Sequence, residues 1–551
     1  MATGTPLDNA SALARRVAIE LRSMGYAWRA GMLQLEPPGQ TVAVFRAIDK
    51  LGQLGGGIAI AAIRHSDRVG LIDELGSLTF GELDERSNAL ACALRARGVA
   101  EGSSVGILAR NHRGFCDITF AGSKVGARLL YLNTDFAGPQ LRDVCEREDV
   151  TLLVHDEEYD GLMDGIEPAH GRLHAWTDEP RDQDTLEALI RDYAGQTPEP
   201  PSEPARVVLL TSGTTGTPKG APRQAGHSLH PLGALLSKVP YRPREKSYVA
   251  APMFHGLGFT QMALAMTIGT TVIVERRFKP ERVLDAIARE QPQVLAVVPV
   301  MLHRIVSVIE EQPGRWDTSS LRIIFSSGSQ LEAELVRRTQ RAIGDVLYNF
   351  YGSTEVAWAT FATPEDLRAA PGTAGRPPFG TIVRLYDGDG RPVYGPDNVG
   401  RIFVGNGFQF EGYTGGGNKE IIDGLMSTGD VGHFDPAGRL FVDGRDDDMI
   451  VSGGENLFPG EVEELLITHE AIGEAAVIGV DDEEFGKRLA AFIVLRPGQS
   501  LSDDELREFV KRNLARYKVP RDITFVEELP RTPTGKVLKR KLREQHAGAV
   551  R

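Results

Sequence analysis

Apolar runs of four or five residues alternate with amphipathic segments through the first two-thirds of the chain. The runs have the length of buried strands and occur at residues 105–108, 151–154, 207–210, 270–274 and 294–298. Segments such as residues 280–290 lie between them with helical spacing, and Thr79–Leu83 is predicted to open a helix. This alternation predicts a parallel sheet covered by helices.

The pattern changes twice towards the C-terminus. After about residue 375 the strands are short and separated by Gly/Asp turns such as residues 385–390, which predicts antiparallel sheet or a small barrel. A charged segment at 443–448 precedes a region of roughly a hundred residues with its own strands and helices. We predict an α/β protein with a large N-terminal domain of parallel-type αβ-layered subdomains plus a small barrel. A small mobile α+β C-terminal domain follows.

The predicted division is an appended helix at 1–45, the N-terminal domain at 46–444, a hinge at 445–448 and a C-terminal lid domain at 449–551. In the appended segment, residues 11–32 carry apolar side chains at helical spacing among arginines, which predicts an amphipathic helix. The favoured interpretation is a helix packed on its own domain. Peripheral contact with acidic lipid is the alternative.

Composition narrows the class of protein. The chain is 41% hydrophobic and 25% charged, with 62 basic against 75 acidic residues and a net charge of −13. An acidic chain without basic blocks is not expected to bind nucleic acid. Three cysteines outside any metal-type spacing predict neither disulfides nor zinc and fit a reducing compartment. With no apolar run near the roughly 18 residues of a membrane span and no signal-peptide pattern, we predict a cytoplasmic protein. A homodimer is left open.

The segment Thr211–Gly220 carries the strongest chemical signal. Its hydroxyls, glycines and lysine follow the apolar run 207–210, and together they suit a triphosphate. It is not a Walker A loop, because the sixth position counted from Gly213 is Pro218, and no hydroxyl residue follows Lys219. The segment closely resembles the phosphate loop of the adenylate-forming enzymes, which include acyl-CoA synthetases, peptide-synthetase adenylation domains and firefly luciferases.

The resemblance extends from about residue 55 to 541, with several motifs in the family's order, and is greatest to bacterial fatty-acid–CoA ligases. It implies a nucleotide site with a phosphate loop, an adenine segment, an acidic motif and a ribose pair. The implied ATP- and AMP-binding residues are Thr211, Ser212, Gly213, Thr214, Thr215, Gly216, Lys219, Gly328, Ser329, Tyr351, Gly352, Thr354, Asp430 and Arg445.

The resemblance also implies catalytic roles. Thr354 would contact the α-phosphate, Glu355 would bind Mg²⁺, and Lys536, in the motif Arg531–Lys536, would act on both reactants. His255 is placed with the catalytic residues for positioning the substrate and not for proton transfer.

Other positions are assigned around these residues. Tyr351 could stack on the base, while Gln330 stands where relatives usually have a small residue, which puts that adenine contact in doubt. The last set is expected to border the acid: Gly256 and Gly258 would leave room for a chain, and Val300 and Trp358 would be walls.

The implied reaction joins ATP, a carboxylic acid and coenzyme A through an acyl-adenylate. In relatives the C-terminal domain rotates about a charged residue, here Asp447, and this brings Ser452, Gly453 and Gly454 to the CoA side. A medium- or long-chain fatty acid is the favoured substrate. The alternatives are a fatty acyl-AMP ligase that loads a carrier protein and a CoA ligase for an aryl or short branched acid. A luciferase-like oxygenase and a binding-only protein are disfavoured.

Overall fold

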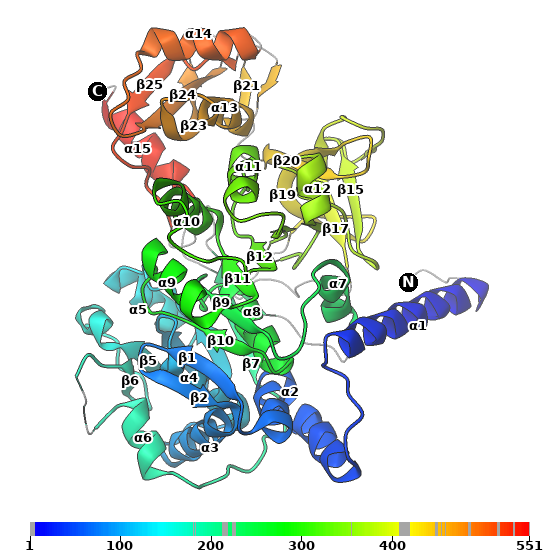
Figure 1. Ribbon diagram of the computed structural model, residues 1–551, viewed down its shortest axis with the longest axis vertical. Helices are drawn as coiled ribbons and strands as arrows, with labels where there is room; N and C mark the ends of the chain where they lie inside the picture. Colours follow the sequence, from blue (N-terminus) through cyan, green and yellow to red (C-terminus); the bar gives the residue numbers. More distant parts are fainter. Residues whose placement is uncertain are drawn as a thin grey trace.

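The computed structural model describes residues 6–179, 181, 183–211, 219–222, 228–353, 355–406, 419–446, 450–452, 455–457, 459–482, 486–514, 518–532 and 535–549. Two large sheets fill the lower and central parts of the molecule in Figure 1, and an antiparallel sheet and a small C-terminal domain lie above them. This agrees with the predicted α/β class, with a large N-terminal and a smaller C-terminal domain.

The first sheet has the strand order β6-β5-β3-β4-β7-β8, and all neighbours are parallel except β7 and β8. Its strands are β3 (Ser104–Leu108), β4 (Arg128–Tyr131), β5 (Val150–Asp156), β6 (Arg172–Trp176), β7 (Arg206–Thr211) and β8 (Lys219–Pro222). Leu129 and Tyr131 enter one core, whereas Leu130 enters another on the opposite face. The sheet is therefore buried on both sides, which explains why its strands are continuous apolar runs.

The second sheet has the order β14-β13-β12-β11-β9-β10-β1-β2 and is antiparallel only at its two edges. Its strands are β1 (Val69–Asp73), β2 (Gly76–Thr79), β9 (Lys246–Val249), β10 (Thr271–Ile273), β11 (Val294–Val297), β12 (Ile323–Ser326), β13 (Leu347–Tyr351) and β14 (Thr360–Ala362). The predicted runs at 270–274 and 294–298 thus form neighbouring parts of one parallel sheet, joined through β9.

Helices cover both sheets. One core joins strands of both sheets to the helices α3 (Phe80–Ala96), α4 (Arg113–Val125) and α8 (Gly256–Thr267). The outer helices are α5 (Gly138–Arg147), η1 (Glu157–Leu162), α6 (Leu186–Asp192), α7 (His230–Lys238), α9 (Pro280–Glu290), α10 (Pro299–Glu311), α11 (Ala333–Ala342) and α12 (Pro364–Ala369). The helix predicted to open near Thr79 is α3, whose N-cap Thr79 forms a reciprocal capping box with Glu82.

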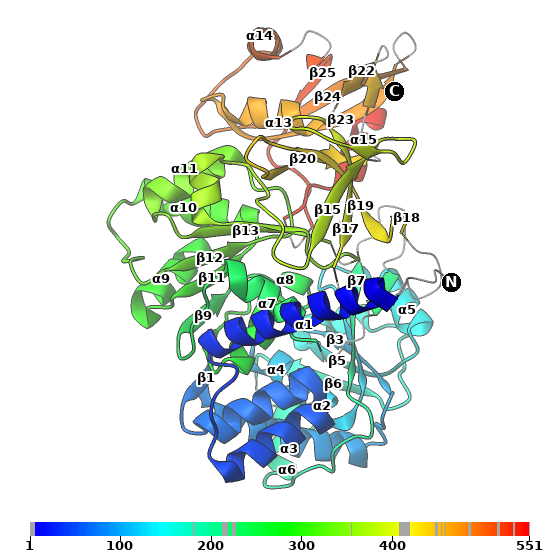
Figure 2. The same cartoon turned by 90° about the vertical axis from the view of Figure 1, so that its right-hand side faces the viewer.

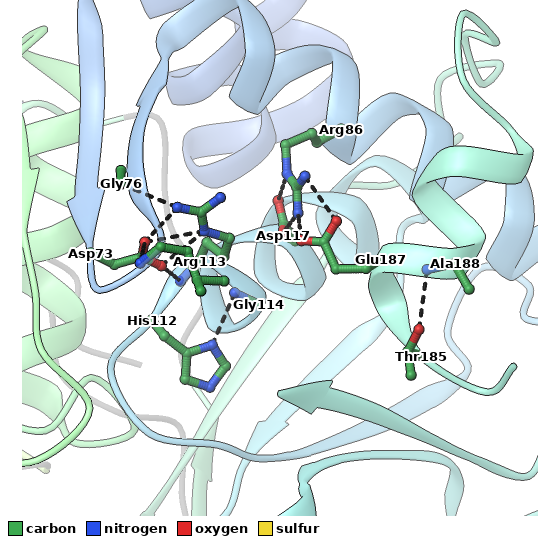
Figure 3. A network of polar contacts seen from close by, with 11 residues as sticks. Asp73, Gly76, Arg86, His112, Arg113, Gly114, Asp117, Thr185, Glu187 and Ala188 are labelled. Atoms are coloured by element: carbon green, nitrogen blue, oxygen red, sulfur yellow. Dashed lines mark hydrogen bonds and ion pairs between the residues drawn. The ribbon is translucent and has the colours of Figure 1, made fainter. Parts of the chain in front are cut away.

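Ion pairs, two of them with buried carboxylates, join these helices to one another and to the second sheet. The guanidinium of Arg86 on α3 contacts the carboxylates of Asp117 on α4 and Glu187 on α6, so one side chain joins three helices (Figure 3). Arg113, at the start of α4, donates to Asp73 at the end of β1. These contacts tie the helix layer to the second sheet and hold the scaffold beneath the site.

The N-terminal segment forms α1 (Pro6–Arg29) and α2 (Pro38–His65), with a non-helical residue at Gly52 inside α2. The division predicted at residue 45 falls within α2. One side of α1 packs on α7, where a Cβ at Gly233 would lie 2.5 Å from the side chain of Ser23. The helix predicted at 11–32 is therefore confirmed, and so is its packing on the domain.

The remaining elements form the upper part of Figure 1. The antiparallel sheet contains β15 (Ile382–Tyr386), β16 (Pro392–Val393), β17 (Gly400–Gly405), β18 (Ile421–Ile422), β19 (Leu425–Phe434) and β20 (Leu440–Arg445). The C-terminal domain contains β21 (Ile450–Ser452), β22 (Glu455–Leu457), α13 (Pro459–Ile467), β23 (Ile472–Asp482), β24 (Gly486–Leu495), α14 (Asp503–Asn513), β25 (Asp522–Phe525) and α15 (Lys539–Ala549). Figures 1 and 2 place this domain next to α10, α11 and β20.

Candidate active site

The predicted ribose pair meets at the top of the N-terminal domain. Asp430 on β19 lies directly opposite Arg445 on β20, and Nη1 of Arg445 is 3.4 Å from Oδ1 of Asp430. The hydroxyl of Tyr351, at the end of β13, donates to Oδ2 of Asp430 at 2.7 Å. Strand register thus brings together Asp430 and Arg445, whose pairing the sequence spacing suggested. The hydrogen bond from Tyr351 links the antiparallel sheet to the second, mainly parallel sheet.

The carboxylate of Asp430 is surrounded by positive charge. Burial raises its pKa, and the hydrogen bond from Tyr351 and the charge of Arg445 oppose that rise. The positive charge of Lys419 also opposes the rise in the pKa of Asp430. Lys419 lies close to Arg445, since a Cβ built on Gly429 would be 3.3 Å from Lys419 Nζ and 3.3 Å from a nitrogen of Arg445. Lys419 was missed by the sequence analysis, since a lysine in a loop has no motif around it. The cations around Asp430 therefore suit an anionic ligand at this place.

Lys536 lies on a hairpin of the C-terminal domain, opposite Thr532. The backbone N–H of Thr532 donates to the carbonyl of Lys536 at 2.8 Å, and the N–H of Lys536 donates to Thr532 Oγ1 at 3.1 Å. Arg531 supports the same turn, since Nη1 donates to the carbonyl of Gly535 at 2.7 Å while Nη2 contacts Glu474 at 2.7 Å. The lysine is thus carried by a defined loop and not by a free chain end.

This hairpin lies against the N-terminal domain. A Cβ at Gly535 would be only 2.1 Å from Val300 Cγ1, in the first turn of α10. The exposed Lys536 is near enough to Asp430 that its positive charge helps to lower the pKa of that carboxyl. Residues from both domains therefore converge on one place, as the motifs implied.

Gln330 has a different environment from the one the sequence suggested. Its Nε2 donates to Oε1 of Glu464 on α13 at 2.9 Å, across the boundary between the domains. A Cβ at the neighbouring Gly460 would lie 3.8 Å from Gln330 Oε1 and 3.1 Å from the carbonyl oxygen of Asp443. The unusual glutamine therefore contacts the C-terminal domain.

The ends of the predicted phosphate loop form a β-hairpin. Thr211 at the end of β7 pairs with Lys219 at the start of β8, so the loop leaves the first sheet at its edge. Ser452 pairs with Glu455 between β21 and β22. The other predicted residues in these loops and the hinge lie outside the described residues, namely Ser212, Gly213, Thr214, Thr215, Gly216, Thr354, Asp447, Gly453 and Gly454.

The acidic motif follows β13. A Cβ at Gly352 would lie 2.1 Å from the carbonyl oxygen of Ala357, so the tight turn requires glycine there. Ser353 Oγ accepts from the backbone N–H of Glu355 at 3.3 Å, and Glu355 is only 9% exposed. A carboxylate at the end of the strand that also carries Tyr351 is a suitable oxygen donor for a hard cation.

His255 precedes α8 and lies near β7. Burial lowers its pKa to about 4, so the imidazole is neutral at pH 7, and its shielded Nε2 has no hydrogen-bond partner among the described groups. The role of His255 in positioning the substrate stays a prediction. Gly256 is exposed, and a Cβ there would have Leu209 at 3.9 Å. The prediction for Gly258 is wrong: a Cβ there would lie 2.4 Å from the carbonyl oxygen of Pro252, so this glycine permits close backbone packing.

The predicted adenine segment follows β12, and the two predicted walls of the acid pocket lie at Trp358 and Val300. Gly328 follows β12 with φ of +99°, beside Val298, and Ser329 is half-buried next to it. Trp358 is buried and donates through Nε1 to Thr381 Oγ1 at 2.9 Å. Val300, as described above, contacts the Lys536 hairpin.

Comparison with known proteins finds two family models in the chain. Residues 59–414 match the family model of the AMP-binding enzymes, and residues 461–536 match the model of the AMP-binding enzyme C-terminal domain.

Individual relatives differ in the acid that their names specify. The chain is 32% identical over 480 residues to indoleacetate–CoA ligase of Aromatoleum aromaticum, covering 85% of this chain and 93% of that protein. It is 28% identical over 483 residues to the long-chain-fatty-acid–CoA ligase FadD13 of Mycobacterium tuberculosis, covering 86% and 94%. The solved anthranilate CoA ligase AuaEII, in complex with anthranoyl-AMP, matches with a TM-score of 0.80 and 25% identity, covering 90% and 98%. The chain belongs to the AMP-binding, adenylate-forming enzymes, in the family of acyl- and aryl-CoA ligases.

Proposed function

We propose that the protein activates a carboxylic acid with ATP and transfers the acyl group to coenzyme A. The observation that carries this proposal is the convergence of Tyr351, Asp430 and Arg445 with Lys536, which comes from the other domain. The first group offers polar contacts suited to a ribose, and the lysine supplies positive charge beside it. Carboxylate and ATP repel each other, so an enzyme that joins them must provide such charge.

In the first half-reaction the carboxylate of the acid attacks the α-phosphorus of ATP, and pyrophosphate leaves. Lys536 would stabilise the negative charge that develops on the α-phosphoryl oxygens. Asp430 and Arg445 would hold the ribose, and the loop between β7 and β8 would bind the β- and γ-phosphates. Glu355 would hold Mg²⁺ beside the substrate phosphates, and Thr354 would contact the α-phosphate. When bound, Mg²⁺ neutralises the charge of the departing pyrophosphate.

In the second half-reaction the CoA thiol attacks the carbonyl carbon of the acyl-adenylate, forming the thioester and releasing AMP. Lys536 must leave this side of the acid for the thiol to enter. We propose the hinge at Asp447 for that movement, with Ser452, Gly453 and Gly454 on the CoA side. The proposed domain limits remain residue 444 for the N-terminal domain and residue 449 for the C-terminal domain.

The acid we propose is a medium- or long-chain fatty acid, which agrees with the named activity of the mycobacterial relative. An aryl acid is the second candidate, because the relatives with similar coverage include ligases named for indoleacetate and anthranilate. We also propose that the protein works in the cytoplasm, on small-molecule substrates.

A pyrophosphate-release assay over short, medium and long fatty acids and aryl acids tests the reaction and the substrate together. We expect release to depend on one acid class and on Mg²⁺, with acyl-CoA as the final product by chromatography. Accumulation of acyl-AMP in the presence of CoA would instead favour a ligase that loads a carrier protein. No pyrophosphate release with any acid would refute the proposed reaction.

A further inference from the structure

Exposed apolar side chains are concentrated at the N-terminus. Among the described side chains, fourteen large apolar residues are exposed, and eight of them lie between residues 17 and 48. These eight are Val17, Leu21, Met24, Trp28, Leu35, Val42, Phe45 and Ile48. A cluster of this kind on a soluble protein is typical of an interaction site.

On α1 the exposed residues form one stripe. Val17, Leu21, Met24 and Trp28 are separated by four, three and four positions, which places them on a single face of the helix. Leu21 is 63% and Trp28 52% exposed. The packing of α1 on α7 therefore leaves a second apolar face uncovered.

The opposite face of α1 holds the helix in place. Ala27 and Ala30 are buried, Tyr26 stacks on Phe379 with the ring centres 5.8 Å apart, and Glu20 accepts from the N–H of Leu229 at 3.1 Å. The helix is thus anchored on the domain by one face while the Leu21–Trp28 face points away from it.

The first half of α2 repeats this arrangement. Val44 and Ala47 pack against Ile60 in the second half of the same helix, beyond the interruption at Gly52. Val42 and Phe45 are exposed, Phe45 by 69%. Figures 1 and 2 show α1 and the first half of α2 on the same side of the molecule. We call this the N-terminal apolar surface, comprising the eight exposed residues above.

The exposed charge of this N-terminal segment is positive, unlike the net charge of the whole chain. Between residues 16 and 50 the exposed charged residues are five cations and one acid, so their sum is +4, whereas the whole chain carries −13. They are Arg16, Arg22, Arg29, Arg46, Lys50 and Asp49. Exposed apolar side chains with basic neighbours are suited to anionic lipid headgroups above an apolar layer.

We propose that the N-terminal apolar surface docks the enzyme on an anionic phospholipid bilayer. The helices would lie in the plane of the headgroups, with the stripe on α1 and the apolar residues of α2 towards the acyl chains. No helix among the described residues is long and apolar enough to cross a bilayer. A symmetric contact with a second copy is less suited, because it would bring the same cationic residues face to face.

Vesicle co-sedimentation with the full-length protein tests this proposal without any catalytic readout. We expect binding to vesicles containing phosphatidylglycerol, weak binding to phosphatidylcholine alone, and loss of binding at high salt. The double substitution Leu21→Glu and Trp28→Glu should weaken binding by roughly a hundredfold, because it removes two apolar contacts. Leu75→Glu is the matched control, since Leu75 is 59% exposed in the turn between β1 and β2.

Arginine substitutions and tryptophan fluorescence test the same proposal without the Leu21→Glu and Trp28→Glu double variant. Arg16→Gln with Arg46→Gln should weaken binding to anionic vesicles and leave binding to neutral vesicles unchanged. The Trp28 emission of the unaltered surface should shift to the blue on vesicle binding. Trp28→Phe should remove that shift, because the other three tryptophans, Trp176, Trp316 and Trp358, lie outside the surface and none of them is exposed. Absence of vesicle binding would overturn the proposal. A dimer in analytical ultracentrifugation that Leu21→Glu dissociates, without vesicle binding, would assign the surface to a second copy.

Discussion

The two halves of the candidate active site are held in different ways. Asp430 and Arg445 face each other across adjacent strands, so their positions follow from the register of one sheet. Lys536 reaches the same place only because its hairpin rests on α10 and α13 lies beside Gln330. The nucleotide side is therefore part of the fold, whereas the lysine side depends on how two domains meet.

The surface between the domains differs from the core of either. It contains Glu332 at the start of α11, facing Glu463 and Glu464 from α13 and Glu474 from β23, with Arg531 as a counter-charge. Polar interfaces within a chain allow relative movement of domains more readily than apolar ones. We therefore expect ribose binding to be insensitive to domain position, whereas adenylation should depend on it, because the proposed catalytic Lys536 comes from the C-terminal domain.

The sharpest test of this difference is Lys536→Ala. Loss of the charge proposed to lie near the α-phosphate should reduce acyl-adenylate formation by roughly 10²- to 10³-fold. This is the range typical of enzymes that lose one hydrogen-bond donor of an oxyanion hole. Thioester formation from preformed acyl-AMP should be largely retained, because the lysine is not needed there. Pyrophosphate release and acyl-CoA formation measure the two steps separately. Lys541→Ala, an exposed lysine on α15, is the matched control. Equal loss of both steps would remove Lys536 from its proposed role.

Asp430→Asn tests the half that the fold holds in place. The amide keeps the shape of the side chain but removes the charge that would accept from the ribose hydroxyls, so kcat/KM for ATP should fall by roughly 10- to 100-fold. The wild type should prefer ATP over 2′-deoxy-ATP, and the variant should lose that preference. Asp389→Asn, in an exposed turn of the same sheet, should behave as the wild type. A retained preference for ATP would place the ribose elsewhere.

Sequence reasoning succeeded where the signal was local. The helix starting after Thr79 depends on residues three apart, and the buried strands depend on short apolar runs. The pairing of Asp430 with Arg445 could be predicted because both residues belong to motifs with characteristic spacing. A local pattern does not show what lies across from a residue in the fold. Gly258 was predicted to leave room for the acyl chain, but the carbonyl of Pro252 occupies the space beside it.

The contacts between domains could not be predicted at all. Gln330 and Glu464 are 134 residues apart, and neither has neighbours that indicate an interaction. Lys419 likewise acquires a role only through its position beside Gly429. Such contacts depend on the placement of whole domains, which no short pattern in the chain encodes.

Gln330→Ala tests a contact that only the structure reveals. Removal of its hydrogen bond to Glu464 should destabilise this domain arrangement by about 1 kcal/mol, or roughly fivefold. Adenylation should therefore slow by that factor, whereas thioester formation from acyl-AMP should be unchanged or faster. Gln499→Ala, an exposed glutamine in the same polypeptide but away from the boundary, is the control.

A double-mutant cycle with Glu464→Ala tests whether the slower adenylation arises from the Gln330–Glu464 hydrogen bond. If it does, Glu464→Ala should slow adenylation little further in the Gln330→Ala background. Fully additive effects on adenylation would show that the two residues act independently and that their hydrogen bond does not set the domain arrangement.

The smallest expected effect concerns pH. Burial, reinforced by Glu463, raises the pKa of Glu332 to about 7, while Arg531 opposes the rise. Because this pKa lies above the ordinary value of 4.5, the protonated form favours the docked domains, and the stabilisation is lost as pH rises through 7. The ratio of adenylation to thioester formation should therefore fall a few-fold between pH 6 and pH 8.

Glu332→Gln should make that ratio independent of pH, because the amide stays neutral. Glu334→Gln, on the same helix but paired with Arg337 and Arg341 at the surface, should keep the wild-type dependence. An unchanged pH profile in Glu332→Gln would mean that the domain contact is not controlled by this carboxyl.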